Sequence, residues 1–409
     1  MLGPLSAMVL LPIAGSLLVF FVSRANARAA KVLTLLISGG TLVLALVIFA
    51  TYRQDQTGFQ MIENYPWAGS FGLSFTLGID GVSLPLLIIS ALLTTLAAAG
   101  SWREISFSVG PYHALLLLFE GAIIGVFTSL NLILFYVFWE LVLIPMFFFI
   151  GVWGGPNKKY AAMKFLIFTH VGSTVMLLGF IALYVFSQPN TFDLVALSTL
   201  RLPLMLQVPM AVAVFFGFAV KLPVVPFHTW LPDAHVEAPA PISVLLAGLL
   251  LKMGGYGFIR IMLGLFPEAS RFLAPGLVGL AVLTMFYGAI VAMIQQDLKR
   301  MIALTSINHM GYVLLGAFSF TAMGLSGAVF QMFNHACAIG ILFLMSGVIH
   351  QQMGTRTIRE LSGFGRVMPV TAVLLVLGSL GAMGFPSFGS FISEYMVILS
   401  AIKVNLLLA

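Results

Sequence analysis

The sequence predicts an all-α protein that crosses a membrane about twelve times. Three observations lead to this fold class. Of the 409 residues, 60% are hydrophobic and only 8% are charged, whereas soluble domains carry about a quarter charged residues. The apolar residues form long runs, and a transmembrane helix needs roughly 20 of them to cross about 30 Å of hydrocarbon. The basic residues punctuate these runs and do not cluster with aromatic residues, which argues against nucleic-acid binding.

The candidate spans follow one another with short connections. They cover residues 2–22, 32–51, 82–100, 112–130, 132–153, 160–186, 208–226, 240–266, 275–295, 301–318, 322–349 and 368–408. The last of these is long enough for one broken helix or two short ones. Residues 67–80 alternate apolar and small residues around glycines, which predicts a short hairpin outside the membrane.

The connections between the spans alternate in charge. Basic residues follow odd-numbered spans at Arg24, Arg28, Lys31, Arg103, Lys158, Lys159, Lys299, Arg300, Arg356, Arg359 and Arg366. By the positive-inside tendency these connections face the cytoplasm or the equivalent compartment of an organelle. The connection that follows Lys221 holds acidic residues and no Lys or Arg, which suggests that it has a role other than topology.

Few ionisable residues lie inside the predicted spans. Each one costs at least a few kcal/mol of insertion free energy and is therefore a functional candidate. These residues are Glu120, Glu140, Lys164, His170, Lys221, Lys252, His309, His335 and Glu394.

Several of these side chains also have a purely structural interpretation. Lys164 lies near two basic residues at a membrane face, so its ammonium group could equally reach the headgroups. Glu120 could simply pair with a lysine. His170 and His335 could form hydrogen bonds between helices, and Gln331 lies four residues before His335 on the same helical face.

Glu140 and Lys221 are harder to explain structurally, because both lie within or at the end of long apolar runs. Pro223 and Pro226 follow Lys221 and break the helix, since proline cannot donate to a preceding carbonyl. Broken backbone at membrane depth is tolerated only where it lines protein or water. We therefore expect a hydrated cavity around Lys221, where a nearby carboxylate such as Glu140 favours the charged lysine and burial opposes it. A lysine in such a place can exchange protons.

Residues 381–395 predict a second broken helix. Gly384, Pro386 and Gly389 interrupt the apolar run, and Glu394 follows. Two broken helices, each with an ionisable residue beside the break, are typical of transporters built from internal repeats.

The segment HTWLPDAHVEAP contains His228, Asp233, His235 and Glu237, but their spacing matches no zinc pattern. A hydrated surface loop that guides protons into the cavity fits these residues better than a metal site does. The sequence also lacks a cysteine cluster, a Gly-rich dinucleotide fingerprint and paired haem ligands. We therefore expect no metal, no cofactor and no redox chemistry in this chain itself.

Three stretches of the chain resemble one protein family closely. They are FYVFWELVLIPMFFFIGVWGG, KLPVVPFHTWLPDAHVEAPAPISVLLAGLLLKMGGYGFIRI and DLKRMIALTSINHMGYVLLG. All three are similar to the antiporter-like subunits of respiratory complex I, the NADH:quinone oxidoreductase, and the likeness runs over nearly the whole chain. Glutamate at position 394 is typical of the chain M type in that family, whereas other antiporter-like subunits typically have lysine there.

The resemblance implies a core of fourteen helices with two inverted five-helix repeats, of which the second would be incomplete in this sequence. The implied divisions are 1–111, 112–266 with a break at 221–226, and 275–409 with a break at 384–390. The implied proton relay consists of Glu140, Lys221, Lys252, His309, His335 and Glu394, with Glu120, Lys164 and His228 as weaker candidates.

In such a protein, protons move at mid-membrane and quinone reduction in other subunits supplies the energy. The partners would be other membrane-arm subunits, and NADH or another donor, FMN, iron–sulfur clusters and quinone would be bound there. The membrane would be a bacterial or archaeal plasma membrane, or an energy-transducing membrane of an organelle.

Two other functions remain open on the residues alone. The chain could be a subunit of a multi-subunit cation (Na⁺)/proton antiporter, or a scaffold that only fills the membrane arm. Four costly charges, at Glu140, Lys221, Lys252 and Glu394, argue against the scaffold.

Overall fold

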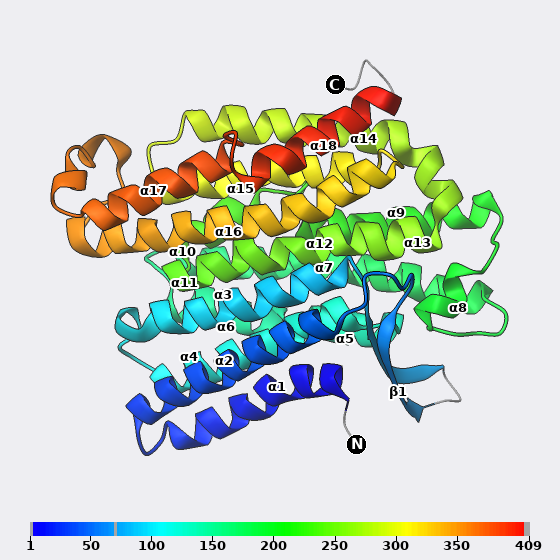
Figure 1. Cartoon of the computed structure of the whole chain (residues 1–409), viewed down its shortest axis with the longest axis horizontal. Helices are drawn as coiled ribbons and strands as arrows, with labels where there is room; N and C mark the ends of the chain where they lie inside the picture. The colour runs from blue at the N-terminus through cyan, green and yellow to red at the C-terminus, as the bar shows by residue number, and fades with distance from the viewer. Residues whose placement is uncertain (1–2, 69–71, 405–409) are drawn as a thin grey trace.

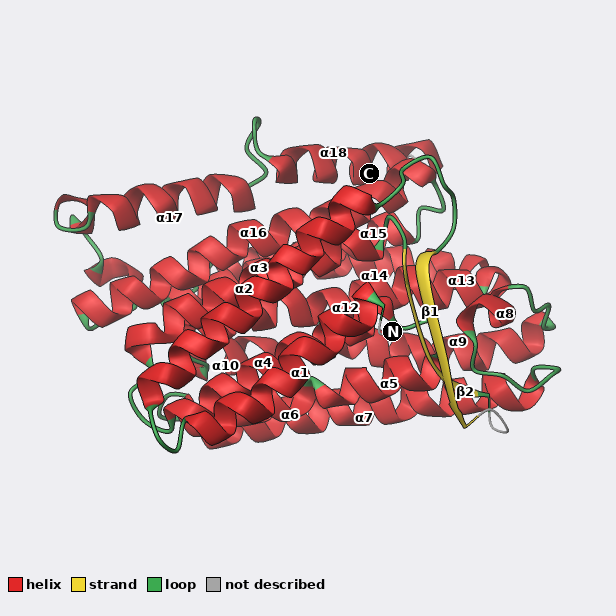
Figure 2. Ribbon diagram, turned by 60° about the horizontal axis from the view of Figure 1, so that its bottom comes forward, coloured by secondary structure: helices red, strands yellow, loops and turns green. Residues whose placement is uncertain are grey.

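The computed structural model describes residues 3–68 and 72–404, and these residues form a helical bundle with one β-hairpin (Figure 1). The long helices lie side by side, and the two strands cross one end of the bundle (Figure 2). Within the described residues, ten helices are long and apolar enough to cross a membrane. The predicted fold class, an all-α polytopic membrane protein, is confirmed.

The N-terminal part forms α1 (Pro4–Val22), α2 (Ala27–Thr51), β1 (Gln60–Ala68), β2 (Leu73–Ile79) and α3 (Ser83–Glu104). The hairpin lies where the glycine-containing stretch predicted it, but its first strand begins at Gln60, earlier than the predicted 67. The pairing register shifts between Gln60 and Glu63 and again between Pro66 and Ala68. These irregularities remove the regular alternation by which a strand can be recognised in a sequence.

The middle of the chain surrounds a fully buried central span. Around it lie α4 (Val109–Thr128), α5 (Leu132–Leu141), α6 (Leu143–Trp153), α7 (Lys158–Phe186), α8 (Leu194–Ser198), α9 (Leu204–Lys221) and α10 (Trp230–Glu237). The central span consists of α11 (Ala240–Leu245), α12 (Leu251–Gly257) and α13 (Leu263–Leu265), joined by the π-helical turns Leu246–Leu250 and Phe258–Met262. Its most apolar window is entirely buried by the other helices.

The C-terminal part forms α14 (Pro267–Met293), α15 (Leu298–Ala317), α16 (Ala322–Met353), α17 (Pro369–Ala382) and α18 (Gly389–Val404). The ninth span begins at Pro267 and not at 275, because proline at the first helical position favours helix initiation. A loop separates α17 from α18 at the second predicted break, and Figure 2 shows the two helices on either side of it.

The segment that the sequence placed in a surface loop, residues 228–239, is mostly helical and largely buried. Trp230, Leu231, Ala234 and His235 of α10 are buried in the bundle. Pro232 is tolerated because it lies in the first helical turn, where no intrahelical hydrogen bond is lost. The predicted loop was wrong, and α10 continues the seventh span beyond the break after α9.

The connections sort to opposite faces of the bundle, as the alternation of charge predicted. One cavity is lined by the end of α3, the α6–α7 connection, the α10–α11 turn, the start of α15 and the end of α16. At the other face, the Leu130 N–H donates to the Thr76 carbonyl of β2 at 2.9 Å, and the Leu194 N–H donates to the Leu130 carbonyl at 2.8 Å. Glu63 of β1 accepts the N–H of Leu5 at 2.7 Å, which satisfies a free donor at the start of α1.

An ion pair ties the central span to the hairpin face. The Arg260 guanidinium donates to the Asp80 carboxylate, which also accepts the backbone N–H groups of Val82 and Ser83 at 3.0 and 3.1 Å. Burial of Asp80 by itself would raise the pKa of its carboxyl group. The Arg260 charge and these hydrogen bonds outweigh burial, so the pKa of Asp80 lies below its ordinary value.

We predict that Asp80→Asn lowers the free energy of unfolding at pH 7 by about 1–3 kcal/mol, because Arg260 loses its counter-charge. The loss is smaller than for a fully buried pair, since the two side chains remain 12% and 20% exposed. A carboxylate with a lowered pKa stabilises the fold above its ordinary pKa of 3.8, and this contribution is lost as the pH falls below that value.

Thermal unfolding of the purified protein in detergent, followed at several pH values, tests this prediction. The difference between wild type and Asp80→Asn should shrink as the pH falls below 3.8. Asp55→Asn, at an exposed position near the start of the hairpin, is the matched control and should change little. Equal unfolding temperatures for Asp80→Asn and wild type at pH 7 would contradict the role of the pair.

Candidate functional site

Lys221 ends α9 at the first break and lies in an aromatic cage. The side chain is only 1% exposed, and its Nζ atom lies 5.2 Å from the centre of the Trp139 ring and 6.0 Å from that of Phe165. Among the described residues the ammonium nitrogen has no hydrogen-bond partner. Cation–π contacts of this kind contribute about 2 kcal/mol when desolvated, less than burying an ammonium group costs.

The carbonyl groups freed by the break are occupied by other parts of the chain. The Ala219 carbonyl accepts the N–H of Val224 at 2.9 Å, and the Val220 carbonyl accepts the indole N–H of Trp230, also at 2.9 Å. The sequence suggested a hydrated cavity lined by free backbone around Lys221. The expectation of free backbone was wrong, because these local hydrogen bonds occupy the carbonyl groups, while the hydration of the site stays a prediction.

Glu140 lies in α5 near Lys221 but faces the outside of the bundle. Its Oε2 atom lies 3.0 Å from Nδ1 of His170 in α7. The interpretation that His170 forms a hydrogen bond between helices therefore agrees with the structure. The two side chains remain 24% and 59% exposed and line a groove of about 550 Å³. Glu140 acts electrostatically on Lys221, although the described residues contain no direct ion pair between them.

Lys252 lies at the centre of the molecule, in the fully buried α12. Its Nζ atom lies 2.6 Å from the Ala247 carbonyl and 2.5 Å from Nδ1 of His335. Ala247 belongs to the first π-helical turn of the central span. Such turns leave carbonyl groups outside the regular ladder and are frequent at functional sites. The π-turn therefore supplies Lys252 with a backbone acceptor inside the membrane.

A line of polar side chains leads from Lys252 to the second break, in which Nε2 of His335 has no hydrogen-bond partner among the described residues. The rings of His335 and His309 have their centroids 5.2 Å apart. Nδ1 of His309 lies 3.3 Å from Oε1 of Glu394, the residue that follows the break in α18. Four of the six predicted relay residues, Lys252, His335, His309 and Glu394, are thus brought into one cluster.

Gln331 completes this cluster and was not among the predicted relay residues. Its amide nitrogen lies 3.2 Å from Nδ1 of His309 and 3.0 Å from Oε1 of Glu394. Its amide oxygen accepts the Ser393 hydroxyl at 2.5 Å, which fixes the orientation of the amide. The sequence suggested Gln331 as a neighbour of His335, because the two are one turn apart, but its hydrogen bonds go to α15 and α18.

Gly384 is required at the second break for two reasons. Its φ of +63° lies in the left-handed region, and a Cβ atom there would lie 2.6 Å from Oε2 of Glu394. Only glycine combines this conformation with so close an approach. The break therefore places backbone directly against the Glu394 carboxylate.

The weaker candidates lie outside the cluster. Lys164 pairs with Asp233 of α10 at 2.7 Å, so it does not need the headgroups as partners. His228 packs edge-on against Tyr287, with ring centroids 4.7 Å apart. Glu120 is fully buried, and neither of its carboxylate oxygens bonds to any described residue, so a lysine partner for it was a wrong expectation.

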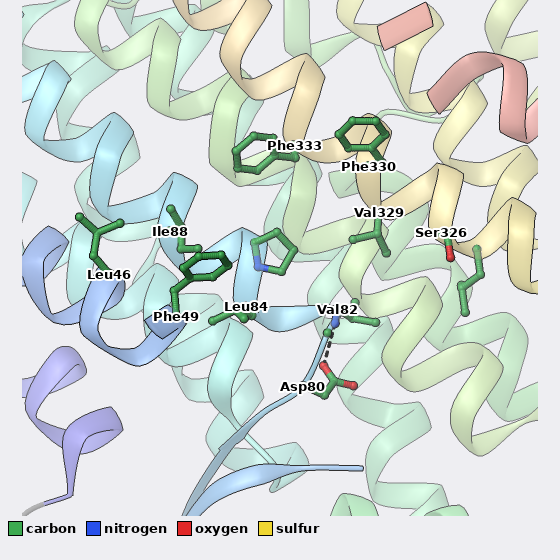
Figure 3. Close-up of a pocket in the computed structure, with 13 residues that line it drawn as sticks. Leu46, Phe49, Asp80, Val82, Leu84, Ile88, Ser326, Val329, Phe330 and Phe333 are labelled. Carbon is green, nitrogen blue, oxygen red and sulfur yellow. Dashed lines mark hydrogen bonds between the residues drawn. The ribbon is translucent and has the colours of Figure 1, made fainter. Parts of the chain in front are cut away.

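A wide groove elsewhere in the described part of the chain is apolar. It has a volume of about 770 Å³ and is lined by side chains of α2, α3 and α16, such as Phe49, Ile88 and Phe333 (Figure 3). Asp80 lies at its edge, with its carboxylate held by the Val82 N–H. In the described part of the chain no three His, Cys, Asp or Glu side chains converge as metal ligands do.

The profile of one protein family, described as "NADH:quinone oxidoreductase/Mrp antiporter, TM", matches residues 129–409, which is more than half of the sequence. The chain belongs to this family. The resemblance seen in the three sequence stretches is therefore confirmed.

Individual relatives agree with this assignment. The NADH-quinone oxidoreductase subunit M of Rickettsia prowazekii is 40% identical over 99% of this chain and 83% of its own length. The NAD(P)H-quinone oxidoreductase chain 4-2 of Synechocystis is 37% identical over 96% of this chain and 70% of its own.

Solved structures share the fold. A chain in the respiratory complex I of Thermus thermophilus with bound NADH is 30% identical, with a TM-score of 0.90, over 98% of this chain and 83% of that one. A chain of the Mrp complex from Dietzia, at 24% identity and a TM-score of 0.85, covers 98% of this chain and 44% of that one. At that identity the Mrp likeness shows the fold alone.

We predict that Gly384→Ala destabilises the protein more than Gly354→Ala does. Both glycines have a positive φ, and alanine in that conformation costs about 1–2 kcal/mol. Only at position 384 does the added methyl group meet a neighbour, and displacing the Glu394 carboxylate from its contacts with His309 and Gln331 should add about 1 kcal/mol.

Thermal unfolding of the two variants in detergent measures the difference directly. Gly354 has no atom within 4 Å of its added Cβ position and is the matched control. Equal losses in the two variants would mean that Glu394 does not lie against the break.

Proposed function

We propose that the chain is a proton-translocating membrane-arm subunit of a complex I-like NADH:quinone oxidoreductase. The observation that carries this proposal is the line from Lys252 through His335 and His309 to Glu394. These groups can all take up and release protons, and they follow one another at contact distance through a core that excludes the surrounding lipid. A scaffold has no need of such a line.

Proton movement along this line needs no redox chemistry in the chain. Lys252 can pass a proton to Nδ1 of His335, and the His335–His309 contact leads on to the Glu394 carboxylate. Gln331 holds His309 and Glu394 in place through its amide. NADH or another donor, FMN, iron–sulfur clusters and quinone would be bound by partner subunits.

The first half of the chain would receive the energy that quinone reduction releases in partner subunits. Glu140 lies at the outer surface of the bundle, where a change in a neighbouring subunit can reach it, and it acts electrostatically on Lys221. Lys221 lacks a hydrogen-bond partner among the described residues, so the charge of Glu140 has a large effect on whether a proton stays on the lysine. Movement of charge at Glu140 would thus drive transfer from Lys221 toward the centre.

The exposed Glu140–His170 pair also indicates a protein partner on that face. A carboxylate and an imidazole in contact with hydrocarbon are unfavourable. Another membrane-arm subunit that packs into the 550 Å³ groove would shield the pair and complete its hydrogen bonds.

We predict that Lys221→Ala and Lys221→Arg both abolish proton pumping while the complex still assembles. Alanine removes the proton carrier. Arginine keeps a positive charge over Trp139 but does not release its proton. Pumping is measured as acidification inside inverted membrane vesicles during quinone reduction, and assembly is measured by native gel electrophoresis.

Lys159→Ala removes an exposed lysine and serves as the control, with pumping unchanged. Pumping by the arginine variant would show that Lys221 supplies a fixed charge and is not a carrier. Loss of the assembled complex in both variants would make the residue structural.

The second candidate function is a subunit of a cation (Na⁺)/proton antiporter, and it is favoured by the family description, which names the Mrp antiporter together with NADH:quinone oxidoreductase. Sodium-driven proton movement in vesicles without an electron donor discriminates between the two functions. We expect no such movement, because the Glu394 carboxylate already contacts His309 and accepts a hydrogen bond from Gln331. To bind Na⁺, which prefers oxygen ligands, the carboxylate would have to give up these nitrogen partners. Proton movement that depends on sodium alone would favour the antiporter.

A further inference from the structure

The apolar groove between α2, α3 and α16 has one polar end. It begins at the hairpin face, where Asp80 precedes α3, and it has a volume of about 770 Å³ (Figure 3). Its walls are hydrophobic side chains such as Phe49, Ile88 and Phe333. Asp80 and Ser326, which lies near the start of α16, contribute the polar side chains of the lining. A ligand for this groove therefore needs a long apolar part and a polar group at one end.

The groove reaches into the membrane to about the depth of one leaflet. Along α16 it is lined from Leu325 to Phe333, and a rise of about 1.5 Å per residue makes this about 12 Å. The hydrocarbon core of a bilayer is about 30 Å thick, so the acyl chains of one leaflet extend about 15 Å. A transmembrane helix of another subunit would need a groove along the whole bundle. The length of the groove therefore fits an acyl chain that enters from the hairpin face.

The Asp80 carboxylate has an unused acceptor at the polar end of the groove. Its Oδ1 atom accepts the backbone N–H groups of Val82 and Ser83 and the guanidinium group of Arg260. Its Oδ2 atom accepts no hydrogen bond from a described residue. The two oxygens of a carboxylate offer about four lone-pair sites, so Oδ2 can still accept from a group that lies in the groove.

The charges at this end favour a zwitterionic headgroup over a headgroup with a net charge. The Asp80–Arg260 pair is neutral overall, so it does not attract a net charge strongly. It is nevertheless a dipole with its negative end at the groove, because Asp80 lines the groove and Arg260 does not. An ammonium group at Asp80 would gain a charge-assisted hydrogen bond. A phosphate in the same headgroup would keep the ligand neutral.

Tyr52 lies at the same end of the groove, directly after α2. A Cβ atom on Gly81, which lines the groove, would lie 3.9 Å from the Tyr52 hydroxyl. A phenol hydroxyl can donate a hydrogen bond to a phosphate, and tyrosine is enriched at the level of the headgroups. Tyr52 therefore offers a donor for a phosphate beside the acceptor that Asp80 offers for an amine.

We propose that this groove binds one phospholipid whose headgroup carries a primary ammonium group. The ammonium group contacts the Asp80 carboxylate, and one acyl chain lies between α2, α3 and α16. The lipid thereby joins the N-terminal helices to the C-terminal part of the bundle. The site shares no residue with the polar line from Lys252 to Glu394, so the proposal stands whether or not the chain moves protons.

The chemistry of the headgroup makes the proposed site selective. The primary ammonium group of phosphatidylethanolamine has N–H donors, whereas the trimethylammonium group of phosphatidylcholine has the same charge and no N–H. Phosphatidylglycerol has no amine and carries a net negative charge. Loss of one charge-assisted hydrogen bond weakens binding about tenfold. We therefore expect phosphatidylethanolamine to bind about tenfold more tightly than phosphatidylcholine, and phosphatidylglycerol to bind most weakly.

Native mass spectrometry of the purified chain in detergent, titrated with these three lipids carrying the same acyl chains, measures the affinities. Ser326→Phe places a ring in the groove, at an exposed position whose hydroxyl forms no hydrogen bond with the rest of the described chain. We expect this variant to bind phosphatidylethanolamine about tenfold more weakly than wild type does. Gly276→Phe, at an exposed position of α14 with no atom within 4 Å of its added Cβ, is the matched control and should bind like wild type.

Asp80→Asn separates recognition of the headgroup from the space for the acyl chain. It removes the negative charge and keeps the shape of the side chain, so the affinity for phosphatidylethanolamine should fall to that for phosphatidylcholine. Equal affinities of the wild type for the three lipids would overturn the contact of an ammonium group with Asp80. Unchanged binding by Ser326→Phe would show that the lipid lies outside the groove, and the proposal would then be wrong.

A second measurement identifies the occupant of the groove in the assembled complex. Phe330, which lines the groove, is replaced by the photoreactive residue p-benzoylphenylalanine, and native membranes are illuminated. We expect a cross-link to a phospholipid with an amine headgroup, detected as an increase in the mass of this chain. A cross-link to another subunit at this position would show that a protein segment fills the groove, which contradicts the lipid site.

Discussion

The site depends above all on one constraint, which is the burial of a lysine in the middle of a fully enclosed helix. Lys252 can lie there because a π-helical turn offers it the Ala247 carbonyl and α16 offers it His335. Helices that include α3, α4, α9, α15 and α16 pack against this span, and its most apolar window is completely covered. An unpartnered ammonium group at this depth would cost many kcal/mol. The Ala247 carbonyl and His335, the first member of the polar line toward Glu394, partner the Lys252 side chain and offset this cost.

The two breaks in the helices serve different purposes. At the first, the freed carbonyls are filled by Val224 and Trp230, and Lys221 faces aromatic rings. At the second, Gly384 brings backbone against Glu394, which in turn holds His309 and Gln331. In the first half, Lys221 therefore has no hydrogen-bond partner among the described residues. In the second half, polar side chains of α15, α16 and α18 contact one another.

The two faces of the bundle also differ in their role. At the hairpin face, hydrogen bonds between connections and the Asp80–Arg260 pair fix the ends of the helices and of the central span. At the basic face, charged side chains surround a cavity above the central span.

The sequence by itself determined the membrane location, the all-α polytopic fold, both breaks and the ionisable residues worth attention, whereas its count of about twelve spans compares with ten helices in the described residues that are long and apolar enough to cross a membrane. Insertion into a bilayer demands long apolar runs, and buried charges are too costly to be accidental, so both leave clear local signals. Only the tertiary structure decided that α10 is a buried helix, that Lys164 pairs with Asp233, and that Gln331 bonds to Glu394 instead of His335. These facts depend on contacts between segments far apart in the chain, and helical periodicity reports which face a residue occupies but not which helix that face meets.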